Sequence, residues 1–216
     1  MKKILFIILI MSFGILTIGC EKNKNNSKEW KIDITDSKQL LGEEEQIFEK
    51  AISNYDKKLD YVSLLATQVV SGTNYMFLCK DEKGYKVVVI YHDLEGNSKV
   101  TKVSDFNPIK YINKENDLNK ENLSGGWYVN VPAKPMMLPE KIQSYFDSAT
   151  KSLTGISYYP IASIAHNGKN NYAVLCYGDI VYKESNASIY VLTLSIDKNN
   201  NPEIASIYEI DLSNYN

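Results

Sequence analysis

The feature that most constrains this chain is an internal repeat. The sequence Asn-Tyr-Met-Phe-Leu-Cys at 74–79 recurs as Asn-Tyr-Ala-Val-Leu-Cys at 171–176, an offset of 97 residues (171 − 74). The same offset relates Trp-Lys-Ile-Asp-Ile at 30–34 to Trp-Tyr-Val-Asn-Val at 127–131. Self-similarity at a fixed period indicates duplication of a structural unit. We therefore expect two copies of one domain.

The offset between the copies changes along the chain. Tyr61 aligns with Tyr158 at 97 residues, whereas 87–93 aligns with 191–197 at 104 residues. The additional residues fall between two expected strands, where a hairpin tip tolerates insertion at little cost. The alignment predicts a first domain over 29–112, a linker over 113–122 and a second domain over 123–216.

Each copy has the pattern of an α+β domain. A short alternating stretch with the Trp comes first, and an apolar pattern at helical spacing follows near 43–55 and again near 139–153. Both helices are apolar on one side only, so each needs a sheet to cover that side. Four runs rich in β-branched and aromatic residues then follow in each copy: 61–70, 74–80, 85–92 and 99–106, and 157–166, 171–182, 188–197 and 203–211. Short links favour antiparallel pairing, which predicts one helix packed on a four- to five-stranded antiparallel sheet in each copy.

The N-terminus has a secretory pattern. Two lysines precede an apolar run over 4–18, which ends in Thr-Ile-Gly-Cys. This ending resembles the bacterial lipoprotein signal, in which a small residue precedes a cysteine that receives diacylglycerol, with Thr17 where an aliphatic residue is more usual. The resemblance implies a signal peptide over 1–19 and lipidation of Cys20. The alternative is an uncleaved membrane anchor, but the run is shorter than the roughly 20 apolar residues that span a bilayer.

The segment after Cys20 is polar. Residues 21–29 are Glu, Lys, Asn and Ser only, a composition that cannot bury enough surface to fold. We expect a lipidated tether over 20–28 that holds the remaining chain at the extracytoplasmic face of the cell membrane. The chain has no Arg and is rich in Lys, Asn and Ile, which indicates an AT-rich genome of the low-GC Gram-positive type.

The charge argues against a nucleic-acid partner. Removal of 1–19 takes away two lysines and no acids, so the formal charge moves from −2 to 22 − 26 = −4. A phosphate backbone calls for a dense basic patch, whereas charges of both signs alternate here.

One motif brings a known family into view. Gln68-Val69-Val70-Ser71-Gly72 falls at the bend between the first two long strands and resembles the Gln-x-Val-x-Gly hairpin of cystatins. The order of one strand, one helix and a four-strand meander is also that of the cystatin fold. The chain further resembles a recurrent uncharacterised domain of secreted bacterial proteins, through this motif, Gly125-Gly126-Trp127 and the turn at 93–97. These resemblances imply two tandem cystatin-like domains.

Cystatins inhibit papain-like cysteine proteases with a wedge of three parts: an N-terminal trunk around a Gly, the Gln-x-Val-x-Gly hairpin, and a later hairpin with Pro-Trp. Here the parts are divided between the copies. Glu29 precedes Trp30 where the trunk would need Gly, and the turn at 93–97 has no Pro-Trp. The second copy has Gly125 and Gly126 before Trp127 but lacks the middle motif. A structural alternative is that Gly72 supplies turn geometry while Val69 and Val70 finish a strand.

The inventory for catalysis is small. Cys79 and Cys176 occupy equivalent strand positions and are expected to be buried apolar thiols. A disulfide between them is possible outside the cell, but equivalent positions in two separate cores should usually lie too far apart to bridge. His92 follows Cys79 by 13 residues, whereas His166 precedes Cys176 by 10, so a duplicated nucleophilic pair is disfavoured.

A metal site is disfavoured as well. Asp197-x-Asn199-x-Asn201 begins like a calcium loop, but Pro202 and Tyr208 stand where that loop needs Gly and Glu. We expect a non-enzymatic lipoprotein, without metal or cofactor, that binds a protein or peptide outside the cytoplasm. The alternative is an inhibitor of cysteine proteases acting through Gln68, Val69, Val70 and Gly72; an enzyme of another type would require a pocket of converging titratable groups.

Overall fold

A computed structural model describes residues 29–32, 34, 42–112, 126–129, 137–168, 170–180 and 187–215. The described part is α+β, with two α-helices and two antiparallel sheets, as the sequence predicts. The first sheet has the order β1-β2-β3-β4 and the second β5-β6-β7-β8-β9. The elements are α2 (Glu43–Ile52), β1 (Asp60–Val69), β2 (Gly72–Asp81), β3 (Gly84–Asp93), β4 (Ser98–Phe106), the 3-10 helix η1 (Pro108–Tyr111), β5 (Tyr128–Val129), α3 (Glu140–Thr150), β6 (Ile156–His166), β7 (Asn171–Ile180), β8 (Ser188–Ile196), β9 (Pro202–Ile210) and the 3-10 helix η3 (Leu212–Tyr215).

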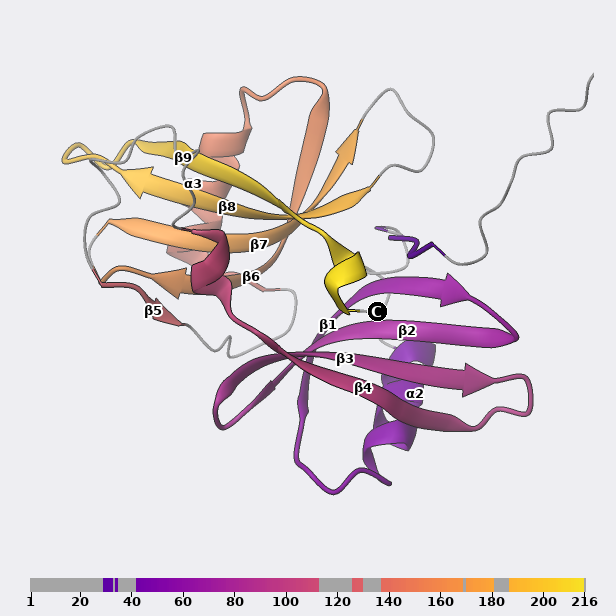
Figure 1. The fold of residues 1–216 in the computed structure, drawn as a ribbon. Coiled ribbons are helices and arrows are strands. Elements are labelled where there is room, and N and C mark those ends of the chain that lie inside the picture. The colour runs from indigo at the N-terminus through magenta and orange to yellow at the C-terminus, as the bar shows by residue number, and fades with distance from the viewer. Residues whose placement is uncertain are drawn as a thin grey trace, which may run out of the picture.

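Each helix covers the outer face of its own sheet (Figure 1). In α2, Phe48 and Ala51 are buried against β1, β2 and β3, and three glutamates in the first turn lie at the positive end of the helix dipole. In α3, Ile142 and Phe146 are buried against β7 and β8. The predicted packing of one helix on each sheet is therefore confirmed.

The inner faces of the two sheets pack on each other and share one apolar layer. This layer joins Leu78 and Val87 of the first sheet to Leu175 and Val191 of the second. Tyr177 crosses it, because its hydroxyl donates to the carbonyl oxygen of Leu64 in the other sheet. The two halves consequently form four layers in the order helix, sheet, sheet, helix.

A second contact between the halves is aromatic. Tyr111 in η1 and Tyr215 in η3 share a hydrogen bond of 3.0 Å between their hydroxyls. Phe106 stacks on Tyr111, and Tyr208 of β9 lies 5.2 Å from Tyr111 between ring centroids. The two 3-10 helices, each after the last strand of its half, thus fasten the halves together.

The repeat extends to irregularities in the strands. The pairing of β3 with β4 shifts between Val89 and Ile90, and the pairing of β8 with β9 shifts between Thr193 and Leu194, 104 residues later. The following turns also match: Asp93 and Asp197 each accept backbone N–H groups of their own turn. A β-bulge affects only one position of a strand pair. Its recurrence 104 residues later, at the equivalent position, supports the duplication.

The alignment of Tyr61 with Tyr158 is wrong by two residues. Cys79 lies opposite Tyr61, whereas its counterpart Cys176 lies opposite Pro160. The hairpin between β1 and β2 is therefore two residues longer than the hairpin between β6 and β7. A change of two residues leaves every side chain on its original face, so the repeat tolerates it without disturbing the core.

Candidate functional site

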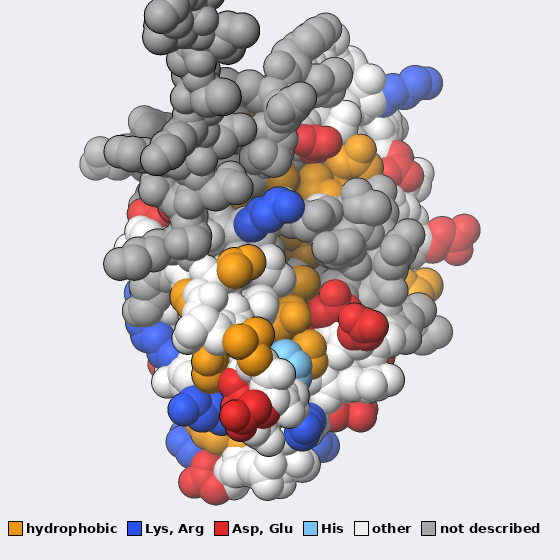
Figure 2. All heavy atoms as spheres, turned by 90° about the vertical axis from the view of Figure 1, so that its right-hand side faces the viewer, with side chains coloured by type: hydrophobic (Ala, Val, Ile, Leu, Met, Phe, Trp, Pro, Cys, Tyr) orange, Lys and Arg blue, Asp and Glu red, His pale blue; other side chains and the backbone are white. Residues whose placement is uncertain are grey.

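The predicted Gln68–Gly72 hairpin projects from one end of the first sheet. Val69 is 63% exposed and Val70 is 40% exposed. Figure 2 views the molecule from the side on which this hairpin projects in Figure 1, and hydrophobic side chains are interspersed with charged ones there. The hairpin is not buried against the second sheet, so it is open to a partner.

The chain around Trp30 lies beside this hairpin. Lys31 and Thr67 exchange two backbone hydrogen bonds of 2.7 and 2.8 Å. Trp30 is half-buried and packs against the shared apolar layer. It also lines an open cavity of about 640 Å³ together with Gln68 and Val70. The structure thus brings the predicted edge residue and the predicted hairpin together.

The turn between β3 and β4 completes this end. Gly72 pairs with Asp93, which places the turn at 93–97 next to the hairpin, and Leu94 at its tip is 88% exposed. Lys50 of α2 donates to the Gly96 carbonyl oxygen at 2.5 Å, which ties the turn to the helix. The sequence motif does not include Leu94. The signal for it is one apolar residue within an otherwise polar turn. We call Trp30, Val69, Val70 and Leu94 the apolar end.

Gly72 is needed for close approach and not for a left-handed turn. Its φ is not positive, and a Cβ placed on it would lie 2.4 Å from the backbone oxygen of His92. Gly72 therefore has a structural role, but that role is to allow close contact between β2 and β3 and not to supply turn geometry. That role is compatible with recognition, because Val69 and Val70 remain exposed.

We expect Gly72→Ala to lower the free energy of unfolding by about 1–3 kcal/mol, since the added Cβ forces β2 away from β3. Val69→Ala is the matched control, and its effect should stay within about 0.5 kcal/mol because that side chain is exposed. Urea unfolding followed by circular dichroism measures both. Equal midpoints for Gly72→Ala and the unmodified chain would contradict the close approach.

The corresponding end of the second half differs. Gly126 and Trp127 precede Tyr128, which pairs with His166 of β6, so these residues lie with the second sheet and not with Gln68. Gly125 lies outside the described residues. Tyr128 is 62% exposed and its ring contacts that of His166 at 5.6 Å. The predicted edge residues therefore divide into two ends, and Trp30 alone accompanies the hairpin.

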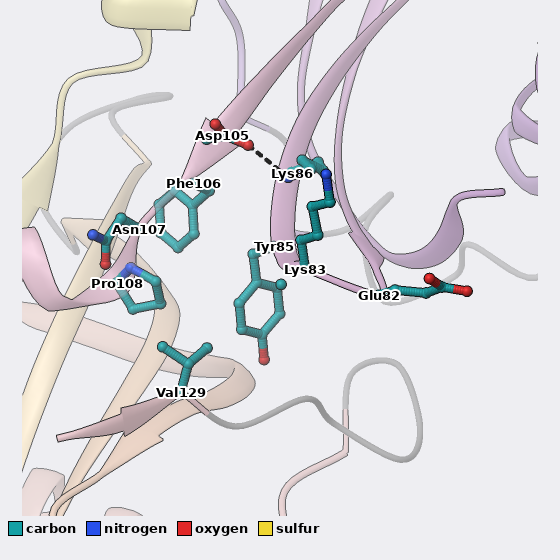
Figure 3. Close-up of a pocket in the computed structure, with 10 residues that line it drawn as sticks. Glu82, Lys83, Tyr85, Lys86, Asp105, Phe106, Asn107, Pro108 and Val129 are labelled. Atoms are coloured by element: carbon teal, nitrogen blue, oxygen red, sulfur yellow. Dashed lines mark hydrogen bonds and ion pairs between the residues drawn. The ribbon is translucent and has the colours of Figure 1, made fainter. Parts of the chain in front are cut away.

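A second open cavity, of about 580 Å³, lies at the opposite end of the first sheet (Figure 3). Lys86 reaches Asp105 at 2.5 Å and Asp81 at 3.3 Å, so its charge is paired. The Tyr85 hydroxyl points toward the side lined by Val129 and has no hydrogen-bond partner among the described residues. Burial raises the pKa of Tyr85, so its hydroxyl is a donor at all ordinary pH values. The described lining of this cavity contains no Ser, Thr, Cys or His side chain.

The cysteines and histidines do not form catalytic pairs within either sheet. Cys79 lies opposite Lys86, six residues from His92, which is about 20 Å along the strand. Cys176 and His166 are separated similarly, since His166 pairs with Tyr172, four residues or about 13 Å away. Both thiols are free and buried beneath the helices on opposite outer faces, as expected for apolar core residues.

Burial raises the pKa values of the Cys79 and Cys176 thiols well above the usual value, which keeps them protonated at pH 8. In residues 21–216, we expect Ellman's reagent to label neither thiol at pH 8 in the folded state and both in denaturant. Prompt labelling of either thiol in the folded protein would show that its burial is wrong.

The turn that begins like a calcium loop is a hairpin turn. The Asp197 carboxylate accepts from the backbone of Asn199 at 2.7 Å and of Asn201 at 2.8 Å. These hydrogen bonds lower the pKa of Asp197 and leave the carboxylate committed to the turn. Among the described residues, no group of three or more His, Cys, Asp or Glu side chains could hold a metal ion.

The predicted lipidation site Cys20, the signal peptide 1–19 and the tether 20–28 lie outside the described residues. Of the helices that are described, none has the length and apolar character to cross a membrane. The resemblances to lipoproteins and to cystatins stay predictions. No protein-family model, no curated protein and no solved structure matches this chain.

Proposed function

We propose that this chain is a non-enzymatic, lipid-anchored protein of two cystatin-like repeats that binds a protein or peptide outside the cytoplasm through its apolar end. The strand, helix and meander order of the second half supports the cystatin-like assignment. The observation that carries the binding proposal is the gathering of Trp30, the exposed Val69 and Val70, and the exposed Leu94 at one end of one sheet.

The energetics favour recognition through this end. Three apolar side chains held on two short turns lose little conformational freedom on binding, because hydrogen bonds and strand pairing already fix their backbones. Complete burial would contribute up to about 1.5–3 kcal/mol for Leu94, and less for Val69 and Val70, which are already partly covered. Since association itself costs several kcal/mol, the partner must also use the polar groups around these side chains.

The proposed anchor limits where the partner can be. If Cys20 is lipidated, residues 20–28 reach at most about 30 Å when fully extended. The chain leaves that tether at Glu29 and Trp30, beside the hairpin. The apolar end would then face partners within about 30 Å of the membrane surface.

A second candidate function is inhibition of papain-like cysteine proteases. One observation favours it: the trunk, the middle hairpin and the later turn lie at a single end, as the resemblance to cystatins requires. The chain departs from the cystatin pattern at two places. Glu29 occupies the position of the trunk Gly, and the turn that contains Leu94 has no Pro-Trp. Leu94 would supply the apolar contact of the missing Trp.

Site-specific photo-crosslinking in the intact cell tests the binding proposal. A benzophenone side chain at position 69 or 94 should give adducts, and Leu94→Asp should abolish the adduct at 69. Position 198 is the matched control, since Lys198 is the counterpart of Leu94 in the second half at the offset of 104. Absence of adducts at 69 and 94, or equal adducts at 198, would contradict the proposal.

Titration of papain-like proteases with soluble residues 21–216 tests the second candidate. Sub-micromolar inhibition that is lost in a Val69→Asp, Leu94→Asp variant but kept in Lys198→Asp would establish it. Gly72 should stay unchanged in such variants, because its substitution disturbs the strand pairing as well as the surface. No inhibition across the panel would reject this candidate and leave the binding proposal standing.

A further inference from the structure

The cavity at the far end of the first sheet contains a buried hydroxyl group without a partner (Figure 3). Tyr85 is 2% exposed, and its hydroxyl makes no hydrogen bond to the described residues. A buried polar group usually has a partner, because leaving it unpaired costs free energy. The Tyr85 hydroxyl is therefore free to bond a ligand that enters this cavity.

The side chains around this hydroxyl are apolar. Tyr85, Phe106, Pro108 and Val129 all line the cavity. The rings of Tyr85 and Phe106 meet edge to face, 6.3 Å apart between centroids. The cavity volume of about 580 Å³ lies in the range of ordinary small-molecule sites. A single aromatic ring or a short aliphatic group fits such a space.

Val129 lies on the route to the hydroxyl. The Tyr85 hydroxyl points toward the side of the cavity that Val129 lines (Figure 3). Val129 is 43% exposed and belongs to β5, a strand of two residues. Exposed side chains change rotamer within nanoseconds, so this one can turn without disturbing the core. A ligand that enters beside Val129 can then reach the hydroxyl.

The charges of the cavity lining balance. Glu82 and Asp105 are negative, and Lys83 and Lys86 are positive. The Lys86 ammonium is already paired with the carboxylates of Asp105 and Asp81, and Glu82 and Lys83 are exposed to water. A carboxylate or an ammonium group of a ligand would lose hydration at the apolar walls without gaining a buried countercharge. The lining therefore favours a neutral ligand.

The hydroxyl selects an oxygen acceptor on that ligand. Burial raises the pKa of Tyr85, so the hydroxyl keeps its proton and can donate. A carbonyl oxygen accepts a hydrogen bond and carries no charge. Ketones, esters and amides combine this oxygen with apolar groups.

We propose that this cavity binds a small neutral compound with a carbonyl oxygen, which accepts from the Tyr85 hydroxyl while its apolar part lies against Phe106 and Val129. This site lies at the opposite end of the first sheet from the apolar end. Its occupation is therefore independent of the proposed function.

Three probes of similar size test the chemistry: acetophenone, toluene and benzoate. Each is titrated into ¹⁵N-labelled residues 21–216, which contain every described residue, and the backbone amide signals are followed. Acetophenone should shift the amides of Tyr85, Phe106 and Val129 in a saturable way and leave those of Leu94 and Gly96 unchanged. Benzoate should bind at least about tenfold more weakly, because its charge loses hydration.

Tyr85→Phe removes only the hydroxyl. It should weaken acetophenone about tenfold, as expected for one lost hydrogen bond, and leave toluene unchanged. Without a ligand, this variant should unfold at the same urea concentration as the unmodified chain or at a higher one, because an unpaired buried hydroxyl has been removed. A hydroxyl that only supports the fold would give a lower midpoint.

Val129→Trp tests the route of entry, since the larger side chain should block the cavity and abolish the acetophenone shifts. Four results would overturn the inference. They are no saturable shift with acetophenone, equal effects of Tyr85→Phe on acetophenone and toluene, a lower urea midpoint for Tyr85→Phe, and unchanged acetophenone binding in Val129→Trp.

Discussion

Replacing Phe77 with alanine is expected to lower the free energy of unfolding of the whole chain by about 3–5 kcal/mol. Phe77 is fully buried between α2 and the first sheet, and its ring contacts those of Phe48 at 5.4 Å and Tyr61 at 5.8 Å between centroids. Its loss leaves a cavity that the surrounding aromatic rings can fill only in part. Because the inner faces share one apolar layer, the second half should lose stability together with the first.

Urea unfolding measured by fluorescence and by circular dichroism checks this prediction. Tyr128→Ala is the control, since that aromatic ring is 62% exposed and its loss should cost less than about 1 kcal/mol. A loss below 1 kcal/mol in Phe77→Ala would show that the ring does not support the core.

Tyr177→Ala is expected to cost a similar amount, about 3–5 kcal/mol, for a different reason. The side chain is 1% exposed and lies between the sheets, with its hydroxyl bonded to the Leu64 carbonyl and 3.3 Å from Ser63 Oγ. Truncation removes both apolar contact and the polar link between the halves. The loss should make the two halves less strongly coupled.

Tyr177→Phe separates these contributions. It keeps the ring and removes only the hydroxyl, so we expect a loss of about 1–3 kcal/mol from the buried groups left without this partner. Chemical denaturation of both variants measures the difference. Equal, small losses for Tyr177→Ala and Tyr177→Phe would mean that the ring does not hold the sheets together.

Local structure was predictable from this sequence to a large extent. The helical spacing near 43–55 and 139–153 corresponds to α2 and α3, and the four-strand meanders correspond to β1–β4 and β6–β9. These elements follow from short-range patterns: one apolar side for a helix, and β-branched residues between turns for a strand. The boundaries of the two domains and of the linker stay predictions.

The packing of the two sheets was not predicted, although a signal was present. Val87, Val88, Val89 and Ile90 are all buried, as are 173–177, so both faces of these strands are covered. A sheet with one face on a helix and the other in water should alternate instead. The continuous apolar runs indicate that a second layer covers these strands. They do not show that the layer is the other sheet, because periodicity does not encode tertiary contacts.

The candidate site was predictable only in part for a similar reason. The Gln68–Gly72 motif located the hairpin, but Leu94 and Lys102 come near it through strand pairing. The sequence alignment also missed the two-residue difference in hairpin length. It kept a constant offset of 97, and a shift of two residues leaves the pattern of inward and outward side chains unchanged. The longer hairpin of the first half carries the exposed Val69 and Val70.

The two repeats share one inner apolar layer and form one structural unit, from one end of which the Gln68–Gly72 hairpin projects. Each half contains one tryptophan, so Trp127→Phe and Trp30→Phe yield single-tryptophan proteins that report the first and second half separately. Equilibrium urea unfolding of both should give coincident fluorescence transitions that also coincide with circular dichroism. Two separated transitions, one for each tryptophan, would show that the halves fold independently and that the shared layer does not couple them.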